Sequence, residues 1–191
     1  KEKVIFSLVL TTNKKNEELP NNIFIEKTKK KDIKLLKTAV IYWPNASWKT
    51  NILKAIEFIK NMILFSSTFV PNIPIRFLWN TFLEPFRLNT ETINKPSEFE
   101  ITFIVDNILY KYWFTMNNNE IISEKLYAYR SQKNSMLFER NKDEIKIWDF
   151  DDNNSVNRVS SEKLALSVFA KEWSAEAIKI HAFFSNIHVF F

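Results

Sequence analysis

Apolar and polar residues alternate in short runs through the second half of the chain, a period typical of strands. The alternation is clearest over residues 99–105, and Asp106 and Asn107 separate this run from a second one over residues 109–116. Two residues between alternating runs predict a hairpin with a tight turn. Further β-type runs follow at residues 121–130, 136–140 and 144–148. We therefore expect residues 97–148 to form an antiparallel meander of about five strands.

The first 66 residues predict short strands and then a strand, loop and helix in succession. Residues 4–10 and 23–26 are short β-type runs, and residues 39–42 close a third apolar run. After Lys49 the apolar residues recur at helical spacing. They are Ile52, Ala55, Ile56, Ile59 and Ile63. This stripe predicts a helix that buries one face.

Two other stretches complete the expected organisation. Residues 67–96 contain several prolines and no periodicity, which predicts a long connection. Helices are expected over residues 160–186, the first running from a Ser160 cap to Glu172 and the second from Ser174 to about Ser185. The side chains expected to face inward on the second helix are Ala177, Ile178, His181 and Phe184.

The composition fits a globular domain. Hydrophobic residues make up 46% of the 191 residues, and the absence of cysteine excludes a disulfide framework and a thiolate metal site. There is no run of 18 apolar residues, so we expect no membrane span and a cytoplasmic location. The first residue is Lys1, and the last run stops in mid-pattern. We therefore expect residues 1–191 to form a single incomplete domain.

Six lysines gather just before the third apolar run. They are Lys27, Lys29, Lys30, Lys31, Lys34 and Lys37. Such a cluster either contacts nucleic-acid phosphates or is a solvated loop before a buried strand. The net charge of +5 permits a nucleic-acid partner without requiring one, and the solvated loop is the simpler interpretation.

The stretch W-P-N-A-S-W-K-T at residues 43–50 is the candidate site. With glycine at positions 43 and 48 it has the spacing of the phosphate-binding loop, G-x-x-x-x-G-K-[ST]. Backbone N–H groups of such a loop, together with the start of the following helix, hold phosphate oxygens. Lys49 would reach the β- and γ-phosphates of ATP, and the Thr50 hydroxyl would bind Mg²⁺. The candidate nucleotide-binding residues are Trp43, Pro44, Asn45, Ala46, Ser47, Trp48, Lys49 and Thr50.

Tryptophan at these two positions contradicts the motif, because the loop backbone must approach the phosphates at angles that a Cβ forbids. The chain has six tryptophans and no glycine, where average usage of about 7% would give on the order of a dozen glycines. One hypothesis is that a codon translated here as tryptophan is decoded as glycine by the organism. Trp148, at an expected strand end, is another candidate, whereas Trp113 fits a strand. The other hypothesis is a loop that has decayed to tryptophan.

Three phrases together resemble a known family. They are LLKTAVIY-x-PNAS-x-KTNILKAIEFIKNMI, KPSEFEITFIVDNILYKY-x-F and MLFER at residues 136–140. The chain resembles AAA-type ATP-binding proteins of the ABC/SMC-like kind, several of which belong to abortive-infection and overcoming-lysogenization-defect systems. The resemblance implies an α/β P-loop NTPase of ABC-ATPase type, with a phosphate-loop core, an antiparallel β-subdomain and C-terminal helices. It also implies ATP and Mg²⁺ as ligands, a homodimer of ATPase heads, and a partner that is DNA or an effector protein.

Catalytic parts of that family are missing from the chain. Residues 103–106 imitate the start of a Walker B motif, but Asn107 follows where glutamate is required, so we expect Asp106 to be a turn residue. There is no Leu-Ser-x-Gly signature. Leu166 and Ser167 begin such a pattern, but the glycine is missing and both residues fall within an expected helix. We therefore expect no catalytic residue in this stretch, and ATP hydrolysis only in a longer protein. The alternative is a degenerate, non-hydrolysing P-loop domain that acts as a DNA-binding or protein-interaction module.

Overall fold

The computed structural model describes residues 5–10, 20–40, 48–69, 96–131, 133–150, 155–172 and 174–189. Short 3₁₀ turns occur at η2 (Pro20–Asn22), η3 (Ser66–Thr68) and η4 (Val156–Arg158). The helices are α1 (Trp48–Phe65), α3 (Ala165–Lys171) and α4 (Ala175–Ser185). The strands are β1 (Ile23–Lys27), β2 (Asp32–Leu36), β3 (Ser97–Val105), β4 (Ile108–Met116), β5 (Ile121–Tyr129), β6 (Ser135–Asn141) and β7 (Glu144–Ile147).

The predicted meander is confirmed as a five-stranded antiparallel sheet in the order β3-β4-β5-β6-β7. Asp106 and Asn107 form the two-residue β3–β4 turn, with φ angles of 51° and 62°. These left-handed values are those of the primed turns that suit the twist of a hairpin. Lys142, in the β6–β7 turn, also has a positive φ, of 54°. In the absence of glycine, aspartate, asparagine and lysine occupy these positions.

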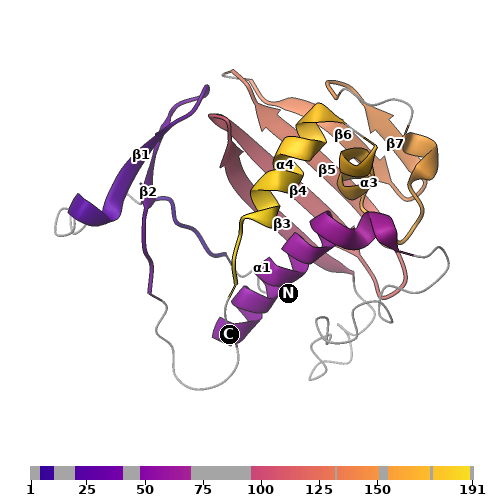
Figure 1. Ribbon diagram of the computed structural model, residues 1–191, viewed down its shortest axis with the longest axis horizontal. Helices are drawn as coiled ribbons and strands as arrows, with labels where there is room; N and C mark the ends of the chain where they lie inside the picture. Colours follow the sequence, from indigo (N-terminus) through magenta and orange to yellow (C-terminus); the bar gives the residue numbers. More distant parts are fainter. Residues whose placement is uncertain are drawn as a thin grey trace.

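Helices α1, α3 and α4 cover one face of this sheet (Figure 1). The C-terminal half of α1 is buried there through Phe58, Met62 and Ile63. The Phe58 ring lies 5.1 Å from the ring of Phe99 on β3, centroid to centroid. From α4, Phe184 packs edge-on against Phe103 at 5.0 Å. The core of the described protein therefore lies between the sheet and these three helices.

The first strands form a separate hairpin beside the five-stranded sheet (Figure 1). β1 and β2 pair in antiparallel fashion, and residues 8–10 lie along the other edge of β2 through the bridge between Val9 and Leu35. The tip of the hairpin touches the main sheet. There the Lys29 N–H donates to the Asn107 carbonyl at 2.9 Å, and Lys30 Nζ lies 4.1 Å from the centroid of the Tyr129 ring.

The structure corrects the sequence-based account of the first 42 residues. Residues 32–36 are strand β2 and not a loop, because Ile33 is buried while Lys34 projects to solvent on the opposite face. Residues 4–10 were expected to be a strand, but the described part makes only the single bridge to β2. Ala39 and Val40 are in no strand, and residues 41–42 lie outside the described ranges.

The helix predictions are partly right. α1 is confirmed, and α4 begins where it was predicted, after Ser174, whose Oγ caps the helix by accepting from the Ala177 N–H at 3.3 Å. Ile178 was wrongly expected to face inward: its side chain is 37% exposed, and Ile180 is buried instead. α3 begins at Ala165 and not at Ser160, because residues 160–163 form a turn held by other contacts. The predicted connection, apart from its first residues 67–69 and Pro96, lies outside the described residues.

Candidate functional site

The first turn of α1 is where the phosphate-loop motif meets the described structure. α1 begins at Trp48, so Lys49 and Thr50 occupy its first turn, as a phosphate loop requires. Residues 43–47, with the predicted contacts Trp43, Pro44, Asn45, Ala46 and Ser47, lie outside the described residues, as do the side chains of residues 48–50. The first turn of α1 carries no acidic side chain to offset the positive end of the helix dipole.

The two halves of α1 have different environments. Its C-terminal half is buried in the core, whereas Asn51, Leu53 and Lys54 near its start are exposed. Ile52 and Ile56, on the predicted apolar stripe, are only half-buried. The start of α1 therefore extends beyond the part of the core that anchors the helix.

The C-terminal end of α1 is fastened to α3 and α4. Ser66 Oγ accepts from the Leu164 N–H at 3.1 Å, and the Ser67 N–H donates to Ser167 Oγ at 3.0 Å. The ring of His181, on α4, shares a hydrogen bond with the Leu64 carbonyl, with 3.2 Å between Nε2 and O. These contacts fix the far end of α1.

A buried glutamate joins the sheet to α3. Glu124 on β5 is fully buried and accepts hydrogen bonds from the Tyr112 hydroxyl at 2.7 Å and from the N–H groups of Ala165 and Leu166 at 2.7 and 3.0 Å. Burial raises the pKa of Glu124, and the opposing charge of Arg140 is the largest influence that lowers it. Burial, with the Glu124 charge beside it, also raises the pKa of Tyr112. The carboxylate thus caps α3 from a distant strand.

Arg140 holds the turn that precedes α3. Its side chain is buried, and its guanidinium donates to the carbonyls of Lys142, Ser160 and Lys163, at 2.6 Å for Lys142 and 3.0 Å for Ser160. Burial lowers the pKa of Arg140, and the Glu124 charge opposes this effect. Sequence reasoning missed both groups. The available signal was a charged residue in phase with inward apolar ones, since Glu124 alternates with Leu126 and Ala128 on β5.

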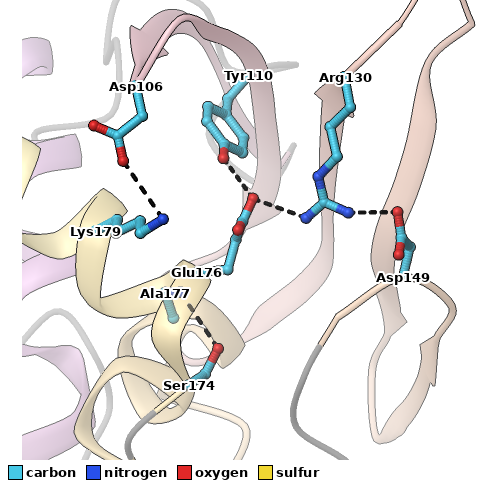
Figure 2. Close-up of polar contacts among 8 residues, drawn as sticks. All are labelled: Asp106, Tyr110, Arg130, Asp149, Ser174, Glu176, Ala177 and Lys179. Atoms are coloured by element: carbon cyan, nitrogen blue, oxygen red, sulfur yellow. Dashed lines mark hydrogen bonds and ion pairs between the residues drawn. The ribbon is translucent and has the colours of Figure 1, made fainter.

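A second charged network lies where α4 meets the sheet (Figure 2). Glu176, in the first turn of α4, accepts from the Tyr110 hydroxyl and from Arg130 Nη2, the latter at 3.0 Å. Arg130 Nη1 also pairs with Asp149 Oδ2 at 2.6 Å. Burial raises the pKa of Tyr110, and the hydrogen bond to Glu176 adds to the shift.

Asp106 is a turn residue, as predicted. Its carboxylate lies 3.5 Å from Lys179 Nζ on α4 (Figure 2). Together with the Glu176 network, this ion pair ties the start of α4 to the sheet. Among the described residues, no group of three or more histidine, cysteine or acidic side chains is arranged to hold a metal ion. We assign both charged networks a structural role, because each joins a helix to the sheet.

Comparison with known proteins identifies a family. The family of AAA domains of the AbiEii toxin type, from a type IV toxin–antitoxin system, matches residues 39–191. No curated protein and no solved structure matches the chain. Within the part of the chain that the structure describes, no helix is long and apolar enough to cross a membrane. The matched range takes in the phosphate-loop motif, α1, the five-stranded sheet, α3 and α4, and the chain therefore belongs to this AAA-type ATPase family related to abortive infection.

Proposed function

We propose that the protein binds ATP and Mg²⁺ through residues 43–50, and that the longer protein hydrolyses ATP as an ABC/SMC-like ATPase in phage defence. The observation that carries the proposal is the start of α1 at Trp48, directly at the Lys49–Thr50 pair of the motif. The proposal includes a homodimer of ATPase heads, a cytoplasmic location, and a partner that is DNA or an effector protein. ATP binding is what an AAA domain is expected to do.

The residues of this chain fit the ligand in part. The start of an 18-residue helix without acidic residues in its first turn suits an anion, and Lys49 and Thr50 would hold the phosphates and Mg²⁺. Bound Mg²⁺ supplies charge neutralisation of the phosphate oxygens. An indole at position 48 does not fit, because residue 48 must bring its backbone against the phosphates. Glycine at positions 43 and 48 removes this conflict.

ATP affinity measured by calorimetry in Mg²⁺ tests the assignment. We expect the Trp43→Gly, Trp48→Gly double variant to bind ATP at least about tenfold more tightly than the printed sequence, a difference of about 1.4 kcal/mol. Adding Lys49→Ala should abolish that binding and leave the fold intact. Trp148→Gly is the matched control, since it makes the same replacement at an exposed position after β7, and it should gain no binding. Equal affinity of the double variant with and without Lys49→Ala would refute the site.

Hydrolysis is tested separately, because the chain has no Walker B Asp-Glu pair and no signature motif. The isolated 191 residues should show negligible ATP turnover even with glycine at positions 43 and 48. Steady-state turnover that disappears in Lys49→Ala would mean that a catalytic carboxylate is present here, and Asp106 would be the first to replace.

The second candidate function is a non-hydrolysing P-loop domain that acts as a DNA-binding or protein-interaction module. The environment of Trp113 favours real tryptophan at that position: its indole N–H donates to Glu98 at 2.8 Å, and Lys125 Nζ lies 5.7 Å from the ring centroid. Neither Trp113 nor Trp148 has a positive φ, so neither backbone requires glycine. Intact-mass spectrometry of the native protein decides, because a mass with all six tryptophans supports this candidate.

A further inference from the structure

Most of the net positive charge of the chain lies on the β1–β2 hairpin. Residues 23–37 contain six lysines and two acidic residues, a net charge of +4, whereas the whole chain has +5. The net charge of all the other residues together is therefore close to zero. A charge so concentrated on one small element attracts polyanions to that element.

The hairpin holds this charge in a defined geometry. Lys27 pairs with Asp32 in the antiparallel register, and residues 28–31 form the turn between them. Thr28 Oγ1 closes the turn, donating to the Lys31 carbonyl at 2.6 Å and accepting from the Lys31 N–H at 3.1 Å. The exposed side chains of Lys27, Lys29 and Lys31 therefore project from a closed tip.

The main sheet supports this tip from one side. The Lys29 N–H donates to Asn107, and Lys30 lies over the ring of Tyr129. These contacts use the backbone of Lys29 and the side chain of Lys30. They leave the ammonium groups of Lys27, Lys29 and Lys31 for a ligand.

Lysines on the five-stranded sheet differ from those of the tip. Lys111 pairs with Glu100 at 3.0 Å, and Lys125 pairs with Glu139 at 2.6 Å. Within the described residues, no such ion pair involves Lys27, Lys29 or Lys31. The tip therefore presents three exposed lysines close together in the chain, none of them in an ion pair with a described acidic residue.

We propose that the tip of the β1–β2 hairpin binds the phosphate backbone of duplex DNA, with Lys27, Lys29 and Lys31 as the contacts. Duplex DNA carries one negative charge per about 1.7 Å of its axis, and its major groove admits a two-stranded β-ribbon. Lysine contacts of this kind position a protein without reading the sequence. This inference gives a surface to the DNA partner of the proposed function and does not depend on ATP binding at residues 43–50.

The test is fluorescence anisotropy of a labelled duplex of about two helical turns, titrated without nucleotide over a series of KCl concentrations. The hairpin variant is Lys27→Gln, Lys29→Gln, Lys31→Gln. The matched control is Lys142→Gln, Lys146→Gln, Lys171→Gln, which removes the same charge from the β6–β7 turn, β7 and α3. Each phosphate contact contributes about 0.9 to the slope of log K against log salt. The hairpin variant should therefore lose about 2.7 of slope and at least about tenfold in affinity, and the control should lose little of either.

Three results would overturn the proposal. The first is an unchanged slope and affinity in the hairpin variant. The second is tighter binding to a single strand of the same length than to the duplex. The third is binding of the native chain to phosphatidylserine vesicles but not to the duplex, which would identify a membrane surface as the partner. ATP calorimetry on the hairpin variant distinguishes failure of this DNA proposal from failure of the proposed function, since Lys49 and Thr50 are unchanged in that variant.

Discussion

The β1–β2 hairpin and the five-stranded sheet are both antiparallel, but among the described elements helices pack only on the sheet. Tyr112 and Leu126 of the sheet are completely buried under α1, α3 and α4. Phe24 and Ile25 of the hairpin are adjacent, so they point to opposite faces, and they are 39% and 55% exposed. Isolated two-stranded hairpins are marginally stable in water. The sheet with its helices therefore supplies the stability of the described fold, and the hairpin contributes charge.

The largest contrast is expected from truncating one phenylalanine in each region. Phe103→Ala removes a buried ring that packs on Tyr110, Phe183 and Phe184, and should lower the free energy of unfolding by about 3–5 kcal/mol. Phe24→Ala on the hairpin should cost less than about 1 kcal/mol. Urea denaturation of both variants measures the difference. Similar losses in the two would show that the hairpin is as tightly integrated as the sheet.

A buried carboxylate within the sheet gives the next contrast. Glu124→Ala leaves the Tyr112 hydroxyl and two N–H groups of α3 without their acceptor, and should cost about 3 kcal/mol. Glu139→Ala on β6 is the control, since it removes only a partly exposed partner of Lys125, and should cost about 1 kcal/mol or less. Denaturation midpoints of the two variants measure this, and equal midpoints would contradict the structural role of Glu124.

Hydrogen exchange sharpens the comparison without mutation. Amides of β4 and β5, in the middle of the covered sheet, should open only with global unfolding. Amides of β1 and β2 should exchange at least about a hundredfold faster, since among the described residues few contacts join the hairpin to the sheet. Peptide-resolved mass spectrometry reads both regions in one sample. Equal protection would mean that the hairpin and the sheet unfold as one unit.

The smallest effect is a pH dependence confined to the sheet. Because burial raises the pKa of Glu124, the folded state binds its proton more tightly than the unfolded state does. The contribution of Glu124 to stability therefore falls as pH rises from its ordinary pKa through its raised folded value. The unfolding free energy of the native chain minus that of Glu124→Gln should therefore decrease as the pH rises through this window. A constant difference would contradict the raised pKa.

Sequence patterns predicted those helices and strands whose formation depends on residues close together in the chain. Alternation with the Asp106–Asn107 turn predicted the sheet, and the apolar stripe after Lys49 predicted α1. Strand β2 was missed because Lys34, together with the lysines that flank the strand, resembles a solvated loop. The start of α3 was missed because its capping carboxylate, Glu124, lies 41 residues earlier in the chain. Contacts that arise only on folding leave no local signal.

The candidate site was likewise predicted from the sequence only in part. The spacing of the motif predicted where α1 begins, and the structure has the helix start at Trp48. The contacts assigned to residues 43–47, and the nucleotide-binding roles of Lys49 and Thr50, stay predictions. The charged networks around Glu124 and Glu176 were not predicted, because their partners come from several separate elements.

The anchoring of α1 at one end has a mechanical consequence. The ten residues before Phe58 extend for about 15 Å at 1.5 Å per residue, while Ser66 and Ser67 clamp the opposite end to α3. Rotation of a stiff rod about a fixed point becomes a larger displacement with distance from that point. A tilt of about 10° about Phe58, where the buried half of α1 begins, would carry Lys49 sideways by roughly 2–3 Å, close to the length of a hydrogen bond. Conversely, a load placed at the N-terminal end of α1 would apply its torque to α3 and, through Glu124, to the middle strand of the sheet.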